Sequence, residues 1–160
     1  MDLRVGIGYD VHAFAENRKL VLGGVAIEYP RGLAGHSDAD VLVHAVIDAL
    51  LGAASLGDIG RLFPDTDPAL RGADSMGLLG RVYELMTEQG VSIVNIDSVV
   101  ICEQPKISPH VDAMKVALSR ALGGLSVERI GVKGTTTEGL GFTGRREGIA
   151  AQAVALVSFG

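Results

Sequence analysis

Cysteine, tryptophan and clusters of positive charge are scarce or missing in this sequence. Cys102 is the single cysteine among 160 residues, so no disulfide can form within the chain, which fits a reducing compartment. There is no tryptophan and there are only three tyrosines and four phenylalanines, so the core must be mainly aliphatic. The net charge is −5 without any run of Lys or Arg, which argues against nucleic acid or an anionic membrane as a partner.

Long apolar runs are missing as well. No apolar stretch approaches the roughly 20 residues that span a bilayer, and the first residues lack the apolar core and basic flank of a signal peptide. The composition, 48% hydrophobic and 21% charged, is typical of a globular protein of one-domain size. We therefore expect one domain over residues 1–160, located in the cytoplasm.

Strand and helix patterns alternate along the chain. We expect strands over 4–14, 91–105, 128–134 and 148–160, the last with a pattern that also allows a helix, and a hairpin over 19–30 that turns at Gly23-Gly24. Helices are expected over about 40–54, 74–90 and 108–124. Ser37 or Asp38 would cap the first helix, and Ser108 would cap the third, with Pro109 at its first position.

This order of elements indicates an α/β (α+β) fold, in which one mixed β-sheet carries helices packed on one face. The other face of so apolar a sheet needs cover, and further copies of the chain would supply it, so a homo-oligomer is expected. A polar loop of about 18 residues, 58–75, separates the first two helices, and loops of that length are more often functional than idle.

Two polar patterns suggest a metal site. In the stretch "GYDVHAF", Asp10 and His12 are two residues apart, so in a strand both side chains leave the same face. In the first helix Asp40, His44 and Asp48 form one stripe on an otherwise apolar surface. The stripe either faces solvent or finds buried partners. The strand pair has its own simpler interpretation, a turn-capping Asp10 and a solvated His12.

If His44 meets Asp10 and His12, the set of two imidazoles and one carboxylate is a familiar zinc site with its fourth position open. Three protein ligands favour a catalytic over a structural metal. Asp40 and Asp48 would then orient the ligands or contact the bound molecule.

Two loops around these residues allow two interpretations each. His36 and Ser37, just before the helix, offer backbone N–H groups and a hydroxyl to an anion, unless Ser37 is only a helix cap. In the long loop, Asp58, Asp65 and Asp67 have the character of turn residues, but they could equally hold sugar or polyol hydroxyls.

The stretch "KGTTTEGLGFTGRREG", residues 133–148, is rich in glycine and hydroxyl groups. Three threonines, free backbone N–H groups, Lys133 and Arg145 suit phosphate oxygens, and Glu138 among them suits Mg²⁺ or Mn²⁺. A polar hairpin loop is the alternative. At a strand end, "CEQPKISP", residues 102–109, offers amides and Lys106 to a base edge, while Cys102 itself reads as a buried small residue.

The blocks "GYDVHAF", "GHSDADVLVHAVIDALLGAASLGDIGRLFPDTDP", "QPK" and "KGTTTEGLGFTGR", in this order, resemble the 2-C-methyl-D-erythritol 2,4-cyclodiphosphate synthase family of the non-mevalonate isoprenoid pathway. The resemblance covers about residues 3–157. It implies a homotrimer with active sites between subunits. It also implies conversion of 4-diphosphocytidyl-2-C-methyl-D-erythritol 2-phosphate to the 2,4-cyclodiphosphate with release of CMP, by a phosphorus–oxygen lyase.

The same resemblance assigns roles to residues. It makes Asp10, His12 and His44 zinc ligands, Glu138 a ligand of Mg²⁺ or Mn²⁺, and His36 and Thr136 catalytic. The implied substrate contacts are Ser37, Asp48, Asp58, Ile59, Gly60, Phe63, Pro64, Asp65, Thr66, Asp67, Cys102, Glu103, Gln104, Pro105, Lys106, Ile107, Ser108, Thr135, Thr137, Glu138, Phe142 and Arg145. Two positions depart from the family pattern: Gly139 stands where lysine is common, and Arg146 where glycine is common.

Two other kinds of function stay open at this point. One is a zinc-dependent phosphodiesterase or hydrolase of a nucleotide diphosphate, which would release linear phosphates. The other is a metal-stabilised trimer without catalysis that binds an isoprenoid diphosphate.

Overall fold

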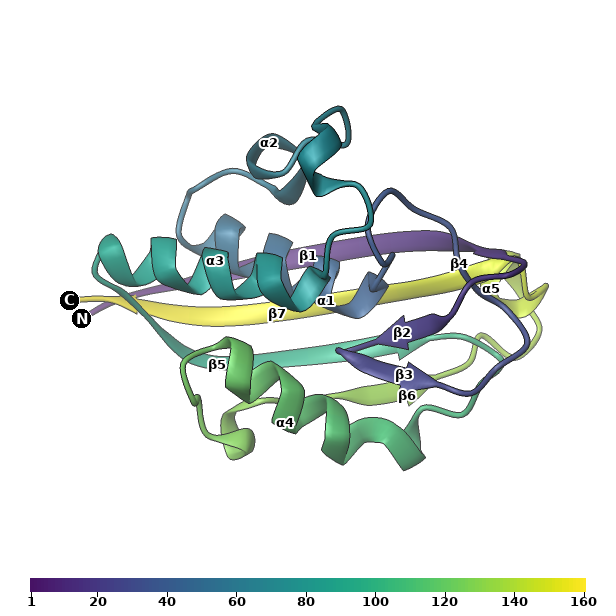
Figure 1. Ribbon diagram of the computed structural model, residues 1–160. Coiled ribbons are helices and arrows are strands. Elements are labelled where there is room, and N and C mark those ends of the chain that lie inside the picture. Colours follow the sequence, from purple (N-terminus) through teal and green to yellow (C-terminus); the bar gives the residue numbers. More distant parts are fainter.

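A five-stranded sheet runs the length of the molecule in the order β4-β1-β7-β5-β6 (Figure 1). The computed structural model describes residues 1–160. The strands are β1 (Asp2–Ala15), β4 (Gly32–Leu33), β5 (Val91–Ile101), β6 (Lys133–Thr135) and β7 (Gly148–Phe159). All neighbours are antiparallel except β5 and β6, which are parallel, so the sheet is mixed as the sequence predicted.

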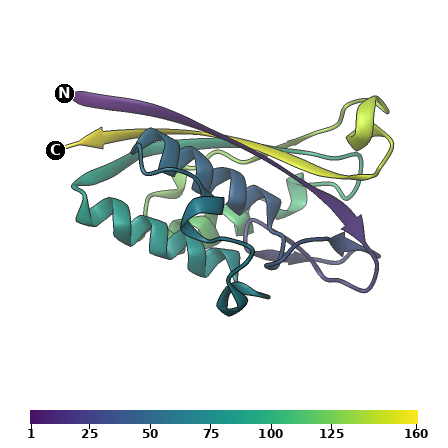
Figure 2. The ribbon, with the colours of Figure 1, turned by 90° about the horizontal axis from the view of Figure 1, so that it is seen from above.

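The three long helices lie on one face of this sheet (Figures 1 and 2). They are α1 (Val41–Ala53), α3 (Ser75–Glu88) and α4 (Val111–Ala121). The short helical segments are α2 (Ile59–Leu62), α5 (Gly141–Gly144), η1 (Pro68–Leu70), η2 (Ser108–His110) and η3 (Val127–Arg129), and a separate hairpin pairs β2 (Leu20–Leu22) with β3 (Val25–Ile27). The predicted fold class is confirmed. No helix combines the length and apolar character needed to cross a membrane.

Helix α1 is buried around almost its whole circumference. Every residue in it except Asp48 and Gly52 is buried, because β1 and β7 cover one side and α3 covers another. The apolar stretch in the sequence therefore reflects complete burial and not a single inward face. A polar side chain on this helix must find a partner inside the protein.

Two glycines bring α1 unusually close to β1. A Cβ atom at Gly6 would lie 2.0 Å from the carbonyl oxygen of Ala49, and one at Gly8 would lie 1.9 Å from that of Ala45. Any larger residue would force the helix away from the strand. Both glycines share the strand face of the "GYDVHAF" polar pair, so this close contact brings α1 to that pair.

The opposite face of the sheet is apolar and open. Its exposed side chains are Leu3, Val5, Ile7, Tyr9 and Val11 of β1 and Val154 of β7. We call this set the apolar outer face. Val5 and Ile7 are 68% and 64% exposed, far more than strand residues of a covered sheet.

The cap of α1 differs from the predicted one. Asp40, and neither Ser37 nor Asp38, occupies the N-cap position, and its carboxylate accepts a 3.1 Å hydrogen bond from the backbone N–H of Val43. The same carboxylate accepts bonds of 2.9 and 2.8 Å from the Gly23 and Gly24 N–H groups in the hairpin turn. Burial raises the pKa of Asp40 to about 6, although these three bonds oppose the increase. The hairpin donors, remote in sequence, thus hold the capping carboxylate in place.

Other predicted boundaries also change. Ser108 does not cap the third helix: the segment begins as η2 after Ile107, without a side-chain cap, and Pro109 lies within that single turn. The strand predicted over 128–134 is mostly η3 and loop, with β6 beginning only at Lys133. The predicted hairpin turn is confirmed, with left-handed φ values of +58° and +74° at its two glycines. The final segment is a strand, so the helical alternative is wrong.

Candidate active site

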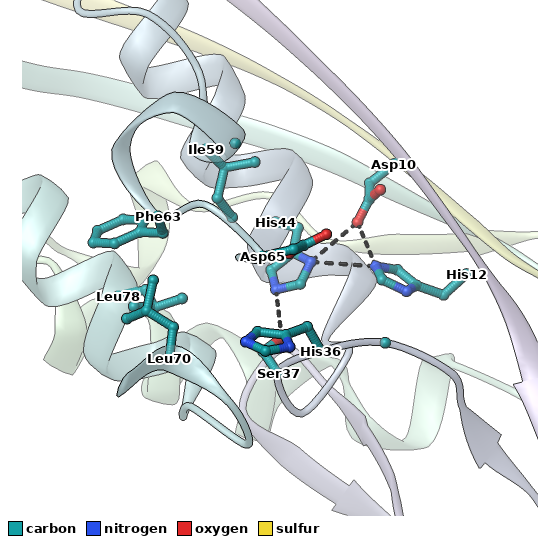
Figure 3. Close-up of a pocket in the computed structure, with 12 residues that line it drawn as sticks. Asp10, His12, His36, Ser37, His44, Ile59, Phe63, Asp65, Leu70 and Leu78 are labelled. Atoms are coloured by element: carbon teal, nitrogen blue, oxygen red, sulfur yellow. Dashed lines mark hydrogen bonds and ion pairs between the residues drawn. The ribbon is translucent and has the colours of Figure 1, made fainter. Parts of the chain in front are cut away.

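Asp10 and His12 of β1 converge with His44 of α1 (Figure 3). Asp10 Oδ2 lies 2.9 Å from His12 Nε2 and 3.1 Å from His44 Nδ1, and the two nitrogens lie 3.3 Å apart. Tetrahedral zinc with bonds of about 2.0–2.1 Å holds its ligand atoms about 3.3 Å from one another. The three atoms therefore lie close to the spacing of a metal site. The predicted meeting is confirmed, and the solvent-facing interpretations of both patterns are wrong.

Each imidazole ring is fixed through the nitrogen that faces away from Asp10. His12 Nδ1 lies 2.6 Å from the carbonyl oxygen of Ala34, which can only accept, so this nitrogen carries the proton. His44 Nε2 lies 2.8 Å from Ser75 Oγ. The inward nitrogens are thus directed at the carboxylate, as metal ligands require.

The local electrostatics favour a cation here. Burial raises the pKa of Asp10, but its pairing with His12 and His44 outweighs this and brings the pKa down to about 2. For His12, burial lowers the pKa, and the hydrogen bond and charge of Asp10 reverse this, so the net change is upward. Asp10 is therefore an anion at neutral pH, as a metal-binding carboxylate must be.

A cavity of about 230 Å³ opens beside these ligands (Figure 3). Of the predicted site residues, it is lined by Asp10, His12, His36, Ser37, His44, Ile59, Gly60, Phe63 and Asp65. Gly35, Leu70 and Leu78, which the sequence did not single out, complete the lining. His36 Nε2 lies 3.3 Å from the carbonyl oxygen of Asp67. The cavity is thus polar beside Asp10, His12 and His44 and apolar along another wall.

The other acidic residues of the α1 stripe do not orient the ligands. Asp40 is occupied by the helix cap, and Asp48 accepts a 2.7 Å hydrogen bond from the backbone N–H of Ile59. Of the two roles predicted for these carboxylates, orienting the metal ligands is wrong, whereas contact with a bound molecule stays a prediction. The carboxylate of Asp38, for which the sequence indicated no such contact, instead accepts from the Ser75 hydroxyl that lies against His44. Burial raises the pKa of Asp48 despite the bond from Ile59.

The long loop uses its acidic residues in two ways. Asp58 caps α2 by accepting from Arg61 N–H at 2.8 Å, and Asp67 caps η1 by accepting from Ala69 N–H at 3.0 Å. These two act as turn residues, as one interpretation predicted, and their contact with sugar hydroxyls stays a prediction. Asp65 instead lines the cavity. Pro64 and Thr66 are exposed on the loop and outside the cavity lining.

A second cavity, of about 340 Å³, lies at the ends of β5 and β6. All seven residues from Cys102 to Ser108 line it, together with Gly134, Thr135 and Thr136. It shares no residue with the first cavity. Burial, and then the charge of Glu103, raise the pKa of the Cys102 thiol to about 11, so this cysteine is no nucleophile near neutral pH.

The glycine-rich stretch lies beyond that cavity and has an unforeseen partner. Its remaining predicted contacts, Thr137, Glu138, Phe142 and Arg145, line neither cavity. The Glu103 carboxylate accepts 3.0 Å hydrogen bonds from the N–H groups of Thr137 and Gly139. Two amides that the sequence offered to phosphate are therefore already occupied. Arg145 forms an ion pair with Glu147.

The loop that carries His36 and Ser37 also has a partner that the sequence did not indicate. The Arg18 guanidinium donates to the carbonyl oxygens of Gly35 and Ser37 at 2.9 and 2.8 Å. No local pattern could have revealed this pairing, because 17 and 19 residues separate the groups.

The fold and the site together define an α/β protein with a group of two histidines and one carboxylate that could hold a metal ion and leave a coordination position open. The YgbB family model matches residues 3–158 of the chain. The chain therefore belongs to the YgbB family.

Several relatives with more than half of their residues identical to this chain share one name. The 2-C-methyl-D-erythritol 2,4-cyclodiphosphate synthase of Clostridium acetobutylicum is 56% identical over 155 residues, 97% of this chain and 99% of that protein. Among solved structures, the bifunctional IspDF of Campylobacter jejuni has a TM-score of 0.95 and 46% identity, covering 99% of this chain and 43% of that one. The CDP complex of IspF from Plasmodium falciparum has a TM-score of 0.85 and 34% identity, with 98% and 96% covered.

Proposed function

We propose that this chain converts 4-diphosphocytidyl-2-C-methyl-D-erythritol 2-phosphate to 2-C-methyl-D-erythritol 2,4-cyclodiphosphate and releases CMP. The observation that carries the proposal is the convergence of Asp10, His12 and His44 beside a polar cavity, in a chain of this family. Residues 1–160 would form one catalytic domain, a phosphorus–oxygen lyase of the non-mevalonate isoprenoid pathway. A cytoplasmic location is part of the proposal, and the single, buried cysteine supports it.

Zinc is the metal that we assign to the three-residue centre, because its preferred ligands and spacing match the donor set. Glu138, an exposed carboxylate beside threonine hydroxyls, would hold Mg²⁺ or Mn²⁺. When bound, the two cations would reduce repulsion between the reacting phosphates and stabilise the charge that develops on them.

The main task of the protein is to position the reacting phosphates and to neutralise their charge. The 2-phosphate of the substrate is already an anion near neutral pH, so an oxygen of it can attack the β-phosphorus without a protein base. The bond from that phosphorus to the CMP oxygen breaks, and its electron pair leaves with CMP. Such phosphoryl transfer depends on alignment and charge stabilisation. His36 and Thr136 would stabilise the transition state, and Ser37, Thr135, Thr137 and Arg145 would contact the phosphates.

The two cavities suggest which part of the substrate binds where. The cavity beside the metal ligands would take the methylerythritol phosphate, with Asp48, Asp58, Gly60 and the loop residues 63–67 around it. The cavity at residues 102–108 would take cytosine, mainly through backbone groups. In a homotrimer with active sites between subunits, a cavity of one chain would lie next to a cavity of the neighbouring chain. The apolar outer face supports such an assembly, since it needs cover.

The test is turnover of the cytidyl substrate by metal-loaded protein in ¹⁸O-labelled water. We expect one CMP for each cyclic diphosphate and no label in either product. Linear phosphates that carry ¹⁸O would instead identify a zinc-dependent phosphodiesterase or hydrolase. Binding of an isoprenoid diphosphate without any CMP would indicate a trimer that lacks catalysis. Either result would overturn the proposal.

A further inference from the structure

The hydroxyl of Ser75 lies between His44 and Asp38, on the side of the imidazole ring that faces away from Asp10. Ser75 Oγ is 2.8 Å from His44 Nε2 and donates its own hydrogen bond to Asp38 Oδ1. The backbone N–H of Ser75 donates to the other carboxylate oxygen of Asp38 at 3.0 Å. Ser75 is completely buried, so water does not substitute for these partners.

The direction of these hydrogen bonds fixes the ring of His44. A serine hydroxyl has one hydrogen, and a carboxylate can only accept, so the Ser75 hydrogen points to Asp38. Toward His44 the hydroxyl oxygen can then only accept, and Nε2 must carry the N–H. In a neutral ring this leaves the lone pair on Nδ1, the nitrogen that lies 3.1 Å from Asp10 Oδ2.

We propose that Asp38 and Ser75 are positioning residues for the metal ligand His44. They select the tautomer and the ring orientation in which Nδ1 can bind the cation. The inference rests on the proposed function, because it takes this centre to hold a divalent metal. It extends to His44 what the Ala34 carbonyl oxygen does for His12.

Ser37 is the only other hydrogen-bond partner of His44 Nε2, and it is the weaker one. Its hydroxyl oxygen lies 3.2 Å from Nε2 and also accepts from the backbone N–H of Ala39 at 3.2 Å. It makes no bond to a carboxylate that would fix its direction. Loss of Ser75 therefore leaves His44 with a longer contact of undefined direction.

The test measures zinc affinity by competition with a chelator, which needs no turnover. We compare the wild-type chain with Ser75→Ala, with the near-isosteric Asp38→Asn, and with Ser98→Ala as a matched control. Ser98 is also buried and donates through its hydroxyl to the Gly131 carbonyl oxygen at 2.8 Å, but far from the metal ligands in sequence and on β5. Ser98→Ala therefore controls for the loss of a buried hydroxyl group and its hydrogen bond.

We expect the zinc dissociation constant to rise about 10- to 100-fold in Ser75→Ala and Asp38→Asn, and to stay within about 2-fold in Ser98→Ala. A second measurement is ¹⁵N NMR of the histidine rings in zinc-loaded protein. The wild-type His44 ring should carry its proton on Nε2 and bind zinc through Nδ1, and in Ser75→Ala the two ring orientations should mix.

Three outcomes overturn the inference. They are wild-type zinc affinity in both variants, an equal loss in the control, or a wild-type His44 ring protonated on Nδ1. Wild-type protein that binds no zinc through His44 would overturn the proposed function as well. Normal wild-type binding with unaffected variants would reject the positioning role alone.

Discussion

The carboxylate of Glu103 holds the backbone on both sides of Glu138. It accepts hydrogen bonds of 3.0 Å from the N–H groups of Thr137 and Gly139, while Glu138 between them has a left-handed φ of +53°. Non-glycine residues adopt this conformation only when their surroundings enforce it. Glu103 thus connects the proposed nucleotide cavity to the proposed ligand of the second metal.

Glu103→Ala should therefore reduce turnover without affecting the first metal centre. The freed backbone around Glu138 would misplace its carboxylate, and we expect kcat to fall by roughly 10- to 100-fold. Glu103→Gln keeps one accepting oxygen and should give an intermediate rate. Zinc affinity, measured in parallel, should equal that of the wild type. A wild-type kcat in the alanine variant would contradict this.

Gly8→Ala should weaken the fold and the site together. A Cβ atom there meets the carbonyl oxygen of Ala45, the residue after His44, so the helix must move away from β1. We expect the free energy of unfolding, measured in urea, to fall by about 3 kcal/mol or more. The matched control is Gly77→Ala in α3, where the new Cβ meets nothing within 4 Å. It should gain about 0.5–1 kcal/mol. Equal effects of the two substitutions would refute the close contact.

Asp40 predicts a pH dependence of stability. Its pKa of about 6 in the fold exceeds its ordinary value of 3.8, so the folded chain holds this proton more tightly than the unfolded chain. Stability from this group is fully present below about pH 4 and is lost as the pH rises through 6. The two pKa values differ by an amount equivalent to about 3 kcal/mol.

Urea unfolding from pH 4 to pH 7 of the wild type and Asp40→Asn measures this contribution. The wild type should lose up to about 3 kcal/mol more than the variant over this range, because the variant cannot titrate at this position. A difference between the two proteins that does not change with pH would show that Asp40 does not titrate in this way.

Arg146 occupies a position at which the backbone favours glycine. Its φ is +59°, and its side chain is exposed. Arg146→Gly should raise the free energy of unfolding by about 0.5–1 kcal/mol, because glycine adopts this conformation without strain. Arg146→Ala removes the charge but keeps the strain, so it should give no such gain. If both variants gain equally in thermal unfolding, the effect belongs to charge and not to the backbone.

Local patterns predicted the parts of this protein that depend on local geometry. The alternation in "GYDVHAF" and the four-residue spacing on the first helix set the direction of Asp10, His12 and His44, and the structure brings them together. The mixed sheet with helices on one face followed from the order of strands and helices.

The failures involve partners that are distant along the chain. The capping carboxylate of Asp40 is also held by the N–H groups of Gly23 and Gly24, 17 and 16 residues earlier. Asp38 is linked to His44 through Ser75, which lies 37 residues after Asp38. Neither pairing leaves a periodic signal, because it depends on how a hairpin and a loop pack against α1.

Zinc-edge anomalous scattering from a crystal soaked in zinc examines the metal centre itself. The structure predicts one strong anomalous peak about 2.0–2.2 Å from Asp10 Oδ2, His12 Nε2 and His44 Nδ1. No peak at that position in excess zinc, or a peak bound only by other residues, would contradict the proposed chemistry.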